Sequence, residues 1–142
     1  MSRAQVFYLH VTLALTTLTG LVFAAMKYWM KGEDEFAAAN HPWQPHMLSA
    51  HVVIAPILLF VIGWAFGNHI LPKLRFGGDE GNRRSGIWSM LLIAPMTLSA
   101  YLMQIATNDA IRKAMAISHW VTSAIFLIGY VAHLLAKPPK ED

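Results

Sequence analysis

Four apolar stretches recur along the sequence, and each is long enough to cross a lipid bilayer as a helix. They cover about residues 5–27, 46–71, 87–107 and 114–136. A membrane-spanning helix needs about 20 mostly apolar residues, and a helix satisfies its own backbone hydrogen bonds where no water is present. The four stretches therefore predict an all-α fold, a transmembrane four-helix bundle whose helices run up, down, up and down.

The composition agrees with a protein that lies almost wholly in the membrane. Of the 142 residues, 56% are hydrophobic and 13% are charged, with a mean hydropathy of +0.43, whereas charged residues make up about 25% of an ordinary soluble domain. We therefore expect one transmembrane domain over residues 1–142, with no soluble module and no signal peptide. The formal net charge of +3 is small and spread over the loops, so we expect no nucleic-acid partner.

The basic residues predict the orientation of the chain. Seven lie on the side of the two termini and the second loop, namely Arg3, Lys73, Arg75, Arg83, Arg84, Lys137 and Lys140. Four lie on the other side, namely Lys27, Lys31, Arg112 and Lys113. Because cytoplasmic loops carry an excess of lysine and arginine, we expect a multi-pass membrane protein with both termini in the cytoplasm.

Two histidines in the fourth stretch indicate a metal site. His119 and His133 are fourteen residues apart, which on a helix corresponds to a rise of about 21 Å and an angular drift of about 40°. Ionisable side chains within a membrane span are costly and usually face the protein interior. The sequence contains seven histidines and no cysteine, so histidine is the strong ligand that remains for a redox metal.

The other histidines of the spans match these two in depth. His10 lies near the cytoplasmic start of the first stretch, level with His133, and His51 lies near the outer start of the second, level with His119. Two imidazoles from different helices at one depth suit the axial ligation of a haem iron. The alternatives are that these histidines only hydrogen-bond to a neighbouring helix, or that they bind zinc or copper, although a tetrahedral site needs more ligands at each level.

This pattern resembles the di-haem, four-helix cytochromes b, which include bacterial cytochrome b561 and the membrane subunits of formate dehydrogenases and nickel–iron hydrogenases. The resemblance rests on His10, on His51 and on the H-x13-H of His119 and His133 within the segments SHW and IGYVAH. It implies two b haems, an inner one held by His10 and His133 and an outer one held by His51 and His119. Val11 departs from the tryptophan that often follows the first of these histidines.

The resemblance also implies a function in the respiratory chain and a location in a bacterial inner (cytoplasmic) membrane. We expect a membrane electron-transfer subunit that passes electrons between quinone and a redox partner subunit, either a multihaem cytochrome or an iron–sulfur protein. One alternative is a free-standing quinol oxidoreductase of the b561 type. The other is a haem-free membrane protein with a structural or metal-carrying role.

Several further polar residues have weaker interpretations. His69 lies eighteen residues after His51, on the same face of a regular helix and about 27 Å along it. His69 and Asn68 together are candidates for binding a quinone head group. Otherwise His69 is an alternative ligand to His133 or a surface residue. His46 is the alternative ligand for the outer haem. The small and hydroxyl residues of the first stretch let a neighbouring helix or a flat ligand come close, and packing against a helix is the preferred interpretation. These residues are Thr12, Thr16, Thr17, Thr19 and Gly20.

Overall fold

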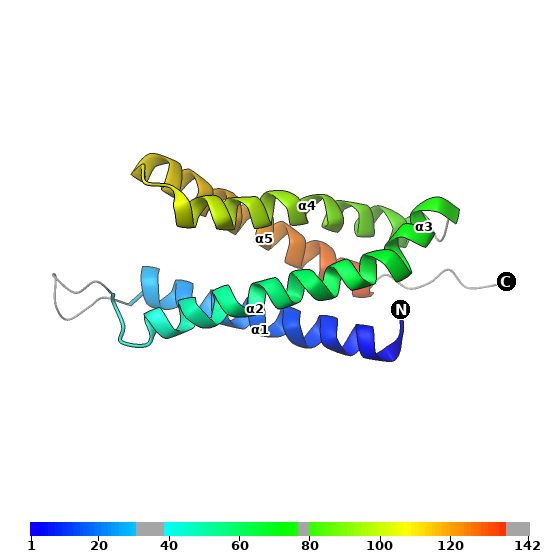
Figure 1. Ribbon diagram of the computed structural model, residues 1–142, viewed down its shortest axis with the longest axis horizontal. Coiled ribbons are helices and arrows are strands. Elements are labelled where there is room, and N and C mark those ends of the chain that lie inside the picture. The colour runs from blue at the N-terminus through cyan, green and yellow to red at the C-terminus, as the bar shows by residue number, and fades with distance from the viewer. Residues whose placement is uncertain (31–38, 77–79, 136–142) are drawn as a thin grey trace. The chain divides into compact units, whose positions relative to one another are not determined.

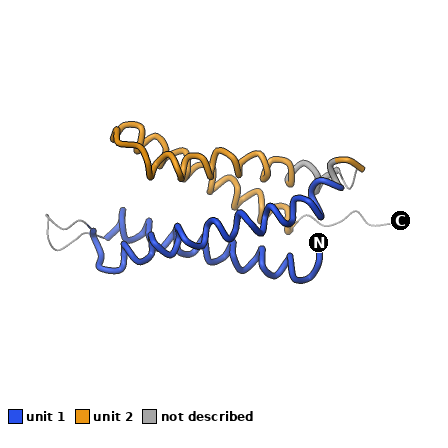
Figure 2. Tube along the Cα trace, in the orientation of Figure 1, with its two compact units in different colours: residues 1–72 blue, residues 73–142 orange. Residues whose placement is uncertain are grey.

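The computed structural model describes residues 1–30, 39–76 and 80–135, and all the regular structure in these ranges is helical. The helices are α1 (Arg3–Tyr28), α2 (Gln44–Ala65), the π-helix η1 (Phe66–Ile70), α3 (Leu71–Phe76), α4 (Glu80–Ile105) and α5 (Asp109–Leu135) (Figure 1). The chain forms two compact units, Met1–Pro72 and Lys73–Asp142 (Figure 2). In the first unit α1 packs against α2, and in the second α4 packs against α5, so each unit is a helical hairpin.

Within the described residues four helices are long and apolar enough to cross a membrane, which confirms the predicted all-α fold with four spans, and the structure pairs these helices in two hairpins. These candidate spans are Arg3–Tyr28, Gln44–Ile70, Gly86–Ile105 and Asp109–Leu135. The last one begins five residues before the predicted 114. The polar residues Asp109, Arg112 and Lys113 lie in its first turns, where sequence alone predicted a connector.

Large apolar side chains remain exposed along all four spans. Phe60 is 74% exposed, Ile105 is 72% exposed and Ile128 is 69% exposed. Exposed apolar area costs about 25 cal/mol per Å² in water, but the hydrocarbon chains of lipid remove this cost. The exposed side chains therefore agree with a multi-pass membrane protein surrounded by lipid.

The length and composition of the spans do not determine which side of the membrane holds the termini. Of the basic residues that predict this orientation, Lys31, Lys137 and Lys140 lie outside the described residues. Cytoplasmic termini stay a prediction.

Side-chain hydrogen bonds mark both ends of α1. At the start of α1 a capping box joins two residues, since Gln5 N–H donates to Ser2 Oγ at 3.2 Å and Ser2 N–H donates to Gln5 Oε1 at 2.9 Å. After the end of α1, Asn40 Nδ2 donates to the Lys27 carbonyl at 2.8 Å. Hydrogen bonds thus fix the first and last turns of this span.

The second span of this hairpin ends in one π-helical turn. The Leu71 N–H donates to the Phe66 carbonyl, five residues back rather than four, and Pro72 has no N–H to donate to the Asn68 carbonyl. The turn contains both Asn68 and His69. The predicted shared face of His51 and His69 assumed a regular α-helix, so that angular relation does not apply across η1.

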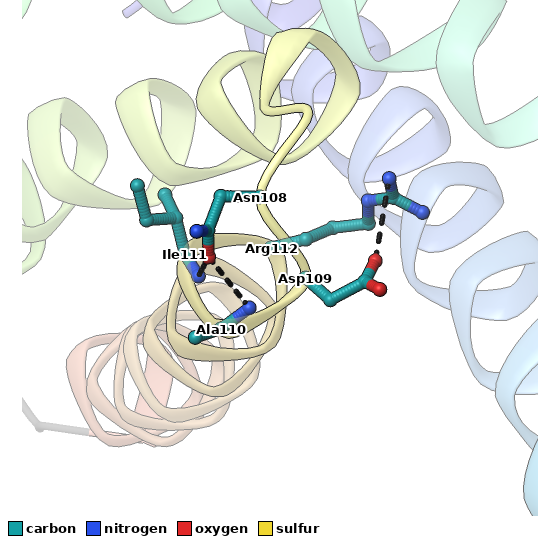
Figure 3. Close-up of polar contacts among 5 residues, drawn as sticks. All are labelled: Asn108, Asp109, Ala110, Ile111 and Arg112. Carbon is teal, nitrogen blue, oxygen red and sulfur yellow. Dashed lines mark hydrogen bonds and ion pairs between the residues drawn. The ribbon is translucent and has the colours of Figure 1, made fainter.

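In the second hairpin, the N-terminus of α5, the helix that carries His119 and His133, is capped by a side chain. Asn108 Oδ1 accepts hydrogen bonds from the N–H groups of Ala110 at 2.9 Å and Ile111 at 3.2 Å (Figure 3). Asp109 also forms an exposed ion pair with Arg112 at 3.5 Å, and its charge is favourable at a helix N-terminus. Asn108 is therefore the N-cap of α5.

We predict that Asn108→Ala lowers the free energy of unfolding by about 1 kcal/mol, because two N–H groups lose their acceptor. Asn108→Ser is the matched control, since serine also accepts at this position and should keep most of the stability. Thermal unfolding of the purified full chain in detergent measures both. Equal stability of the alanine and serine variants would contradict the capping role.

Candidate functional site

His51, on α2, is held by the neighbouring helix α1. Its Nδ1 lies 2.9 Å from the carbonyl oxygen of Thr16 and 3.4 Å from Thr19 Oγ1. A carbonyl oxygen only accepts hydrogen bonds, so Nδ1 carries the hydrogen. In the neutral ring Nε2 then holds the lone pair, which is the form of histidine that binds a metal.

Gly20 provides the space for this ring. A Cβ atom at residue 20 would lie 2.9 Å from His51 Cε1 and 3.1 Å from its Nδ1. Both distances are shorter than ordinary van der Waals contacts, so the ring would have to shift. The sequence predicts that Thr16, Thr19 and Gly20 allow close approach of a helix or a flat ligand, but it does not predict their contact with His51. Their spacing of three and four residues, which places them on one side of a helix, was the available signal.

His119, on α5, is held in the same way by α4. Its Nδ1 lies 2.9 Å from the carbonyl oxygen of Met96, so this nitrogen also carries the hydrogen and Nε2 holds the lone pair. The Ser99 hydroxyl donates to the same carbonyl at 3.0 Å. The two histidines predicted to bind the outer haem thus share one tautomer and one kind of partner, a backbone carbonyl of the adjacent helix.

The two histidines predicted for the inner haem have different surroundings. His133, on α5, is half-buried, and a Cβ atom at Gly86 of α4 would lie 3.8 Å from its Cε1, an ordinary van der Waals distance. His10, on α1, is exposed and lies about 120° around the helix from Thr16, as follows from 100° per residue. His10 therefore projects from a different side of α1 than the side that holds His51.

Each predicted haem pair takes one histidine from each unit. His10 and His51 belong to Met1–Pro72, and His119 and His133 belong to Lys73–Asp142. The pairings of His10 with His133 and of His51 with His119 stay predictions. Within residues 1–30, 39–76 and 80–135 no three or more histidine and acidic side chains form a group that could hold a metal ion, whereas a haem iron needs two axial ligands.

The remaining sequence candidates lie towards the ends of the second span. Asn68 is exposed and His69 is half-buried, both within η1. His46 is exposed near the start of α2, with its ring 5.9 Å from the ring of Trp43 in an edge arrangement. His41 Nδ1 accepts a hydrogen bond from Trp43 N–H at 3.1 Å, so in this loop histidine Nδ1 has the opposite role from that in His51 and His119.

No protein-family model, curated protein or solved structure matches the chain. We therefore infer the function of the histidines from their geometry and from the sequence pattern.

We predict that Gly20→Ala lowers the free energy of unfolding by about 1–3 kcal/mol, the usual cost of overfilling a packed site. The added methyl group forces the His51 ring to move, which disturbs its hydrogen bond to Thr16. Gly63→Ala is the matched control on α2, because a Cβ atom there meets nothing within 4 Å and alanine is favoured over glycine in a helix by about 0.5–1 kcal/mol. Thermal unfolding should rank Gly63→Ala at or above the unchanged chain and Gly20→Ala below it, and the reverse order would contradict the role of Gly20.

Proposed function

We propose that the chain is a membrane electron-transfer subunit that carries electrons between the quinone pool and a redox partner subunit. In this proposal two b haems are bound, the inner one by His10 and His133 and the outer one by His51 and His119. The pairs come from the depths of the histidines in the sequence. The single observation that best supports the proposal is the Nδ1–H hydrogen bond of His51 and of His119.

This hydrogen bond is the feature expected around a metal-binding histidine. Such a histidine almost always donates its other ring N–H to a carbonyl, carboxylate or water, which fixes the tautomer and the ring orientation and raises the basicity of the ligating nitrogen. His51 and His119 each donate to a backbone carbonyl at 2.9 Å. His41 differs, since its Nδ1 accepts a hydrogen bond, so the Nδ1–H tautomer of His51 and His119 is not shared by every histidine of the chain.

The residues present fit a haem in donor type. The four proposed ligands are imidazoles, and Gly20 leaves the His51 ring room that any side chain would take. A bound haem supplies one-electron chemistry. The chain's own residues hold a proton on Nδ1, aim the imidazoles and surround them with apolar helices. Because two axial histidines leave no open coordination position, the proposal is electron transfer rather than catalysis at the iron.

The proposal assigns the quinone head group to Asn68 and His69. An amide and an imidazole can donate and accept hydrogen bonds, and both lie in the π-helical turn at the end of a span. Interruptions of this kind occur frequently at functional sites. The proposed partner subunit is a multihaem cytochrome or an iron–sulfur protein, and the proposed location is a bacterial inner membrane with cytoplasmic termini.

The direct test is the absorption spectrum of the purified chain, reduced minus oxidised, with the ratio of haem to protein. Expression with ample haem supply should give a red protein with the bands of b haem and two haems per chain. A colourless preparation under the same conditions would overturn the proposal.

Alanine variants test the assignment of ligands. We predict that His51→Ala and His119→Ala each remove the outer haem and leave the inner one, and that His10→Ala and His133→Ala do the reverse. The haem-to-protein ratio and the spectrum of the remaining haem measure this outcome. His46→Ala is the control and should keep both haems. Loss of the outer haem in His46→Ala, with retention in His51→Ala, would show that the ligand is misassigned.

A further inference from the structure

The same three-group arrangement occurs in both hairpins. In the first, the Thr16 carbonyl accepts from His51 Nδ1, and the hydroxyl oxygen of Thr19, three residues further on, lies 3.1 Å from the same carbonyl. In the second, the Met96 carbonyl accepts from His119 Nδ1, and Ser99, also three residues further on, donates to it at 3.0 Å. Each histidine therefore has a hydroxyl group beside the carbonyl that accepts from its Nδ1.

The two hydroxyl groups nevertheless act differently on their histidines. Ser99 is 3% exposed, and its hydroxyl hydrogen points to the Met96 carbonyl. A carbonyl that already accepts one hydrogen bond is a weaker acceptor for the second donor, because the two donors share the same electron density. Ser99 thus weakens the hydrogen bond that His119 donates.

Thr19 has a better acceptor elsewhere. Its hydroxyl donates to the Leu15 carbonyl at 2.8 Å, a shorter distance than the 3.1 Å to the Thr16 carbonyl. With its hydrogen directed to Leu15, the Thr19 oxygen presents a lone pair to His51 Nδ1 at 3.4 Å. Thr19 therefore gives the Nδ1–H of His51 a second acceptor.

We propose that Thr19 and Ser99 are positioning residues that set the strength of the Nδ1–H hydrogen bonds of the two imidazoles in opposite directions. Thr19 strengthens the hydrogen bonding of His51 Nδ1–H and so makes its Nε2 a stronger donor to a metal, and Ser99 makes the Nε2 of His119 a weaker one. The redox consequence rests on the proposed function. A stronger axial donor favours the oxidised iron and lowers the midpoint potential, so the two hydroxyl groups shift the outer haem in opposite directions.

Other hydroxyl groups of the spans provide matched controls. Thr12 donates to the Tyr8 carbonyl of its own helix at 2.7 Å. Thr122 donates to the Ser118 carbonyl of its own helix at 2.7 Å, and its oxygen also lies 3.2 Å from the backbone carbonyl of His119. Neither bond involves a carbonyl that accepts from a histidine. Thr12→Val and Thr122→Val therefore remove a hydroxyl group from a span without changing the acceptors of His51 or His119.

The first experiment measures the hydrogen bonds themselves. The full chain, labelled with ¹⁵N-histidine, is purified in detergent and kept reduced, and the Nδ1–H proton resonances of His51 and His119 are recorded by NMR. Ser99→Ala should move the His119 resonance downfield, towards a stronger hydrogen bond, and Thr19→Val should move the His51 resonance upfield. Thr19→Ser, which keeps the hydroxyl group, should restore the original position. Shifts of the same sign, or equal shifts in Thr12→Val and Thr122→Val, would overturn the proposal.

The second experiment measures the redox consequence by potentiometric titration of the same variants. Ser99→Ala should lower the midpoint potential of the outer haem, Thr19→Val should raise it, and both controls should leave it unchanged. A chain without haem would overturn the proposed function while the NMR measurement still decides the roles of the two hydroxyl groups. Haem-loaded variants with shifted resonances and unchanged potentials would overturn the redox consequence alone.

Discussion

A histidine ring inside a hydrocarbon layer needs hydrogen-bond partners, because no water can serve there. In both hairpins the partner is a backbone carbonyl of the adjacent helix, Thr16 for His51 and Met96 for His119. A carbonyl can only accept, so each bond leaves the lone pair on Nε2. The rest of the candidate site depends on this constraint, because it determines which nitrogen can bind a metal and which direction the ring faces.

The constraint also explains the small and hydroxyl residues that surround His51. The ring can approach the Thr16 carbonyl because residue 20 has no side chain. Threonines suit such a helix, since the hydroxyl groups of Thr12 and Thr16 donate to carbonyls of the preceding turn and are thereby satisfied without water. The features that let α1 and α2 pack closely are therefore the features that hold the imidazole.

The number and nature of the helices could be predicted from the sequence because length and apolarity decide them, but finer features could not. The start of α5 was predicted too late, since Asp109 and Arg112 look like loop residues until Asn108 is recognised as a cap. The π-helical turn forms because the Leu71 N–H donates to the carbonyl five residues back rather than four, and no clear sequence pattern predicts this difference. The carbonyls that accept from His51 and His119 could not be predicted from the sequence either, because every residue has a carbonyl and helix packing determines which one lies beside the ring.

We propose that His51 and His119 bind one iron through Nε2, each held by its Nδ1–H bond. Pulsed electron paramagnetic resonance of the oxidised chain, with histidine labelled by ¹⁵N, is the direct test of this proposal. We expect low-spin ferric iron coupled to two imidazole nitrogens at the haem that is lost in His119→Ala. A single coupled imidazole at that haem, or none, would contradict it.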